Sequence, residues 1–180
     1  MTVAFVVRRL SNYRLLGAVI DQALRAGIRV ECWHDYSFPR YGLKEYLFPA
    51  TDSAPRFHYG RPHVREYQGP ADLVERLERV RVDAVVSLTP LTMDTAGVVP
   101  KRRPPWVCLQ SGPDTFMYSL RHLESCDLLA LYTPWWLDWG ASLRSAVEGT
   151  GNLLGTKKTL AERGRFVGYP GADPAGLVDR

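Results

Sequence analysis

The residues with the clearest chemical potential follow a buried apolar run within PPWVCLQSGPDTFMYS, residues 104–119. If WVCLQ forms a strand, Gln110, Ser111 and Gly112 lie at one edge of a sheet, and Asp114 can begin the helix that follows. A carboxylate at such a position can act as a general base toward an alcohol. The alternative is that Asp114 only caps the helix. The stretch therefore predicts either a reaction centre or a structural cap.

A second polar group follows the first apolar run of the chain and consists of Arg8, Arg9, Ser11 and Asn12. Free backbone N–H groups and the helix dipole favour an anion at a helix N-terminus, so these residues could hold a phosphate or a carboxylate. The alternative is that Ser11 or Asn12 only caps the helix and the arginines are solvated. Three further candidates for binding stand at the ends of other apolar runs, namely His34, Asp35 and Thr89.

Several familiar chemistries lack their sequence signatures. The turn after the first strand has no G-x-G-x-x-G for a dinucleotide, and no G-K-[ST] phosphate loop is present. His58 and His63 have no carboxylate or thiol nearby, and the order of residues yields no Ser–His–Asp or Cys–His set. We therefore predict no bound cofactor and no metal.

Length and composition predict one ordinary globular domain. The chain has 180 residues and a net charge of +4, and its basic residues are scattered rather than gathered on one face, so we expect no nucleic-acid partner. No apolar run is long enough to span a membrane. The three cysteines form no C-x-x-C pair, which favours a reducing cytoplasm. Tryptophans at 135–139 could expose an apolar patch and support a homodimer.

Five short apolar runs are typical of buried strands: TVAFVV, IRVECW, DAVVSL, WVCLQ and DLLALY. Helical spacing separates them between a cap at Ser11 or Asn12 and an end at Gly27, and again at 70–80, and it recurs at 134–147 and 157–163. The aromatic-rich residues 34–62 are too long for an ordinary connection. Alternation of strands and helices predicts an α/β fold, a Rossmann-like parallel sheet with helices on both faces. Ligands of such sheets bind beyond the carboxyl ends of the strands, where the strand order reverses.

Four motifs along the chain, AFVV, VDAVVS, WVCLQSG and GYPGAD, resemble the N-terminal half of GT-B glycosyltransferases and of the related CDP-glycerol glycerophosphotransferases. The resemblance implies that residues 1–164 form an acceptor-side domain. It also implies that residues 165–180 begin the connection to a C-terminal donor domain that is absent from this chain. The partners would then be a carbohydrate acceptor and a nucleotide-activated donor, the donor held mostly by the second domain.

The sequence departs from the glycerophosphotransferase pattern at one position that matters. Those proteins have His-Gly after the corresponding strand, with the histidine as base, and this chain has Ser111-Gly112. Serine cannot act as a base unaided, so Asp114, Asp35 or Asp94 would take the proton, unless the chemistry is retaining or has been lost. Asp114 and Ser111 are thus the catalytic candidates. The competing hypothesis is a stand-alone Rossmann or flavodoxin-like module that binds a small anion or a protein partner.

Overall fold

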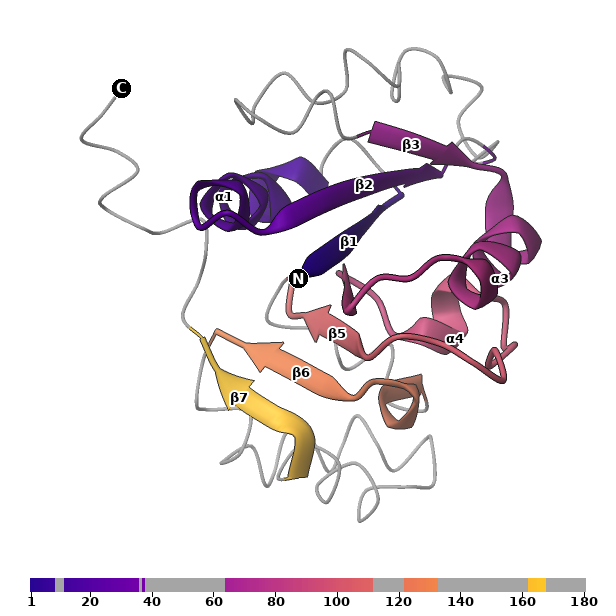
Figure 1. Cartoon of the computed structure of the whole chain (residues 1–180). Coiled ribbons are helices and arrows are strands. Elements are labelled where there is room, and N and C mark those ends of the chain that lie inside the picture. The colour runs from indigo at the N-terminus through magenta and orange to yellow at the C-terminus, as the bar shows by residue number, and fades with distance from the viewer. Residues whose placement is uncertain (9–11, 36, 38–63, 112–121, 133–161, 168–180) are drawn as a thin grey trace.

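The computed structural model describes residues 1–8, 12–35, 37, 64–111, 122–132 and 162–167. Its centre is a single sheet in which every neighbouring pair of strands is parallel (Figure 1). The seven strands are β1 (Thr2–Val7), β2 (Arg29–Asp35), β3 (Val64–Tyr67), β4 (Ala84–Ser87), β5 (Trp106–Leu109), β6 (Leu128–Leu131) and β7 (Gly164–Phe166).

The strand order β3-β2-β1-β4-β5-β6-β7 contains one reversal, between β1 and β4. The chain first moves outward from β1 to β3, then returns to the other side of β1 and continues outward to β7. Phe5 shows the central place of β1, because it pairs with Cys32 on one side and with Val86 on the other. The carboxyl ends of β1 and β4 therefore meet at the position where such sheets bind their ligands.

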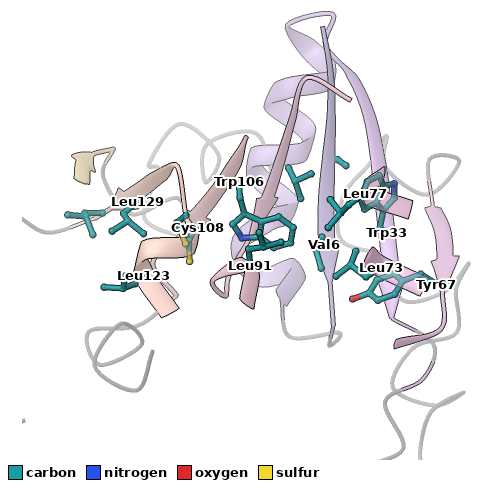
Figure 2. Packing of buried hydrophobic residues seen from close by; sticks show 14 residues of the cluster. Val6, Trp33, Tyr67, Leu73, Leu77, Leu91, Trp106, Cys108, Leu123 and Leu129 are labelled. Carbon is teal, nitrogen blue, oxygen red and sulfur yellow. The ribbon is translucent and has the colours of Figure 1, made fainter. Parts of the chain in front are cut away.

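Helices cover both faces of the sheet, as the alternating side chains of β1 require. Val3, Phe5 and Val7 pack with the buried side chains of α1 (Tyr13–Arg25), and we call this the α1 face. Ala4 and Val6 point the other way, toward α3 (Gly69–Arg79) and the one-turn helix α4 (Leu91–Asp94), which is the α3/α4 face. On that face Trp33, Tyr67, Leu73 and Leu77 gather at one end, and Trp106 and Leu91 lie beside them (Figure 2).

This architecture confirms the predicted α/β parallel sheet with helices on both faces. The five predicted strands are present, and so are the helix predicted to end at Gly27 and the helix predicted at 70–80; Gly27 ends α1 in the left-handed region at φ 73°. Two short elements were not predicted, β3 and α4, whereas β7 lies at the short apolar run RFV that begins at residue 165. Strand β3 has the sequence VREY, in which two charged residues hide the apolar pattern, and α4 is a single turn.

Strand β7 bears on the expected domain boundary. It pairs with β6 through Phe166, so the boundary expected after residue 164 falls inside a strand of the sheet. The helices predicted at 134–147 and near 157–163, the aromatic residues 38–62 and the connection at 168–180 lie outside the described residues, apart from the last two positions of the second helix. In the part of the chain that the structure describes, no helix has the length and apolar character needed to cross a membrane.

Candidate functional site

Arg8 directly follows β1 and lies at the reversal in strand order, between two carboxylates. Its Nη1 is 3.3 Å from Oδ1 of Asp94, and its Nε is 3.8 Å from Oδ2 of Asp35. The two aspartate side chains are almost completely enclosed, at 0% and 4% exposure, whereas the Arg8 side chain is 30% exposed. The acids therefore orient a guanidinium that reaches solvent at the carboxyl edge. We call Arg8, Asp35, Asp94 and Thr89 the switch-point cluster.

Asp94 is the central acceptor of this cluster. After β4 the chain passes through Pro90 into α4. Asp94 is the last residue of this single turn and lies next to Ser87, at the carboxyl end of β4. Its Oδ2 accepts a hydrogen bond from the Ser87 hydroxyl at 2.7 Å, and its Oδ1 accepts one from the Thr89 hydroxyl at 2.6 Å. Burial raises the pKa of Asp94, and the Arg8 charge and the two hydroxyl donors oppose that rise. Asp94 thus holds the side chains of Arg8 and Thr89 in position at the carboxyl edge of the sheet.

Asp35 is fixed from the other side of Arg8. Its Oδ1 accepts hydrogen bonds from the backbone N–H of Ser37 at 2.9 Å and from the Ser37 hydroxyl at 2.6 Å, a local turn that holds the carboxylate at the end of β2. Gly69 at the start of α3 approaches Ser37 closely. Tyr67 is buried next to the acids: burial raises its pKa, and the charges of Asp94 and Asp35 raise it further.

The structure brings together Arg8, Asp35 and Thr89 of the residues predicted for binding, and it separates His34 from them. His34 shares the α1 face with Cys32 and is fully buried, and burial lowers its pKa from 6.5 to about 4. Consecutive residues of a strand point to opposite faces, so the His34 and Asp35 side chains lie on opposite sides of the sheet. A ligand-binding role for His34 beside Asp35 is therefore not supported by its placement.

Asn12 and Gln110 have structural partners in the fold. The Asn12 side chain makes no cap to the helix that follows it; instead its Oδ1 accepts the backbone N–H of Arg8 at 3.0 Å. Gln110 is buried at the end of β5, and its Oε1 accepts the backbone N–H of Tyr132 at 3.2 Å, which links the ends of β5 and β6. Ser111 follows it, half-buried. The other predicted site residues lie outside the described residues: Arg9, Ser11, Gly112 and Asp114.

The charges of the switch-point cluster limit the kinds of ligand that it can bind. Among the described residues of the cluster one guanidinium faces two carboxyl groups, so the field that Arg8 offers to a phosphate is largely cancelled. Both acids are also enclosed, which keeps their oxygens from a ligand. The accessible donors and acceptors are the exposed part of Arg8 and the half-buried Thr89. Such groups suit the hydroxyls of an uncharged ligand. In the described part of the chain no three His, Cys, Asp or Glu side chains are grouped to hold a metal ion.

Sequence reasoning named Asp94 only as one of several acids and missed Tyr67 and Ser37. The part of the sequence that could have indicated Asp94 is TPLTMD, which follows β4. Pro90 starts a single helical turn there, and this turn brings Asp94 back toward the end of β4. The hydrogen bonds that make Asp94 central depend on side-chain geometry, which spacing alone does not specify.

Fold and site together define a class: an α/β protein with a Rossmann-like parallel sheet and a polar cluster at its switch point. No family model matches the chain, and no curated protein or solved structure matches it. The resemblance to the N-terminal half of GT-B transferases therefore depends on the sequence motifs alone.

Proposed function

We propose that this domain binds the acceptor in a GT-B-type transferase, which moves a glycosyl or glycerophosphate group from a nucleotide-activated donor to a carbohydrate hydroxyl. The observation that carries the proposal is the switch-point cluster, in which enclosed Asp94 and Asp35 hold a partly exposed Arg8 at the edge where Rossmann-like sheets bind ligands. The cluster offers hydrogen-bonding groups with little net positive charge, and this matches a sugar better than a free phosphate.

Each residue then has a distinct role. Arg8 and Thr89 contact acceptor hydroxyls, and Asp94 and Asp35 position them. Because both of these acids are enclosed, the proton of the attacking hydroxyl would pass to Asp114, which stands three positions after Ser111 in the sequence. We place the protein in the cytoplasm with small-molecule partners and without nucleic acid, in keeping with its scattered basic residues and its three free thiols.

Calorimetric titration of the chain with maltose, CDP-glycerol and UDP-glucose tests the proposal. We expect the uncharged maltose to bind more tightly than either nucleotide, and we expect Arg8→Gln to weaken maltose binding about tenfold through the loss of a charged hydrogen-bond donor. Arg29→Gln is the matched control, because Arg29 is exposed at the opposite, amino end of β2. Equal affinity in both variants, or no binding to any of the three ligands, would contradict the proposal. Binding of inorganic phosphate alone would favour the stand-alone anion-binding module.

A further inference from the structure

Tyr67 ends β3, and the register of the strands places it in line with the switch-point cluster. Its Cα pairs with that of Asp35, the last residue of β2. Val7 of β1 pairs with His34 of β2, so the next residues along these two strands, Arg8 and Asp35, also lie side by side. Paired residues of neighbouring parallel strands point to the same face of the sheet. Tyr67, Asp35 and Arg8 therefore form one row at the carboxyl edge of the α3/α4 face.

The core holds the Tyr67 ring in one orientation. The residue is 2% exposed, and Trp33, Leu73 and Leu77 lie near it in the same apolar cluster. Figure 2 shows its oxygen on the side of the ring that faces Leu73 and Val6, toward β1 and away from the outer edge of the sheet. The hydroxyl is thus fixed before a ligand arrives, and this lowers the entropic cost of binding one.

The Tyr67 hydroxyl has no hydrogen-bond partner within the described ranges of the chain. Among those residues, Nε of Arg76 is the one fully buried side-chain polar atom without a partner, so the Tyr67 hydroxyl retains contact with solvent. The acids near it are already occupied: Oδ1 of Asp35 accepts two hydrogen bonds from Ser37, and both oxygens of Asp94 accept hydroxyl groups. A nearly enclosed hydroxyl without a partner is unfavourable in the free protein and indicates a ligand.

The charges around this hydroxyl determine which ligand atom it binds. Burial raises the pKa of Tyr67, and the negative charges of Asp94 and Asp35 raise it further, so the phenol stays protonated at neutral pH. A neutral O–H group is a good donor to the oxygen of a ligand hydroxyl. A phosphate at the same place would be repelled by the two carboxylates. The hydroxyl therefore favours an uncharged, oxygen-rich ligand.

We propose that Tyr67 is a further ligand-binding residue of the switch-point cluster, and that its hydroxyl donates a hydrogen bond to a sugar oxygen of the ligand that Arg8 contacts. This inference rests on the proposed function and extends the acceptor site from the ends of β1 and β4 to the end of β3. The ring of Tyr67 stabilises the fold, whereas its hydroxyl serves the ligand.

The test is isothermal titration of the full chain with maltose, in which the wild type is compared with Tyr67→Phe. This variant keeps the buried ring and removes only the hydroxyl. We expect it to weaken maltose binding about fivefold, the effect of one neutral hydrogen bond. We also expect its midpoint of urea denaturation to stay unchanged or to rise, since the hydroxyl has no internal partner to lose. Tyr132→Phe is the matched control, because Tyr132 follows β6, three strands from β1, and should leave maltose affinity unchanged.

Two results would overturn this inference and leave the proposed function standing. If Arg8→Gln weakens maltose binding and Tyr67→Phe does not, the Tyr67 hydroxyl does not contact the ligand. If the urea midpoint of Tyr67→Phe falls below that of the wild type, the hydroxyl is used within the fold. Failure of the wild type to bind maltose is a different outcome, which would contradict the proposed function and this inference together.

Discussion

The two faces of the sheet bury similar apolar side chains but differ in the chemistry that they enclose. On the α1 face, Leu16 and Ile20 pack against the odd-numbered residues of β1, and the titratable groups Cys32 and His34 are held neutral by burial. The α3/α4 face also has an apolar core, which includes the buried free thiols Cys108 and Cys126, but its carboxyl edge contains the switch-point cluster.

The difference follows from how the chain returns to the sheet after each strand. On the α1 face a single long helix runs from the end of β1 toward the start of β2 and covers the strands with a continuous apolar stripe. On the other face the return after β4 is a proline and one helical turn, which is too short to cover an apolar surface and instead brings Asp94 beneath the edge. In this fold the polar side chains of the switch-point cluster therefore lie where the connection after a strand is short.

The largest effect is expected at Asp94. Replacing it in Asp94→Ala leaves Arg8 without its closest carboxylate and two hydroxyls without their acceptor, which should cost about 4 kcal/mol of unfolding free energy. Urea denaturation measures this cost. Glu75→Ala, which removes only an exposed helical pair with Arg79, should cost about 0.3 kcal/mol. A loss below about 1 kcal/mol for Asp94→Ala would mean that the cluster does not hold the edge together.

On the opposite face the pH dependence of stability should report His34. Because its pKa falls from 6.5 in the unfolded chain to about 4 in the folded one, its stabilising contribution is complete above pH 6.5 and is lost as the pH falls toward 4. At about 1.4 kcal/mol per pKa unit, the loss is at most about 3.5 kcal/mol.

Comparison with His34→Gln isolates this contribution in urea denaturation at pH 7 and pH 4. Asp94 titrates with the opposite sign: its raised pKa favours the folded state below the ordinary 3.8, and this benefit is lost as the pH rises through the raised value. If wild type and His34→Gln lose stability in parallel between pH 6.5 and 4, His34 is not held neutral by the α1 face.

Two glycines with left-handed backbones allow a smaller comparison between the edges. Gly69, at φ 78°, would bring a Cβ to 2.9 Å from the Ser37 Oγ that supports Asp35, whereas Gly27, at φ 73°, has nothing within 4 Å of that position. Alanine should cost about 1 kcal/mol at Gly27 from backbone strain and about 2 kcal/mol at Gly69, where Ser37 must also shift. Thermal unfolding of the two variants measures the difference, and equal costs would indicate that Ser37 moves freely.

The smallest effect concerns ligand charge. Asp35→Asn removes one of the two carboxylates facing Arg8, so the variant should bind inorganic phosphate about fivefold more tightly than the wild type, a change of ~1 kcal/mol. Isothermal titration at low ionic strength detects the change, with Asp83→Asn as a control at the exposed, opposite edge. Unchanged phosphate affinity would show that Asp35 does not offset the Arg8 charge.

The sequence was sufficient for the sheet because apolar runs such as TVAFVV need cover on both faces, and the helix before Gly27 supplies it on one of them. It also placed Arg8, Asp35 and Thr89 at a common edge, since every strand runs the same way. His34 is buried on the α1 face, whereas Asp35 lies next to Arg8, so the structure places these two predicted binding residues on different sides of the sheet. The ion pair between Arg8 and Asp94 joins residues 86 positions apart, so it depends on the packing of distant segments, which no local pattern encodes.

The most direct test of the central claim is backbone amide chemical-shift mapping with the tightest-binding of the three ligands. We expect the largest shifts at the carboxyl edge, at Arg8, Ser37 and Thr89, and no change for amides at the amino edge, such as Thr2 and Arg29. The largest shifts at the amino edge, or none anywhere at saturating ligand, would contradict that claim.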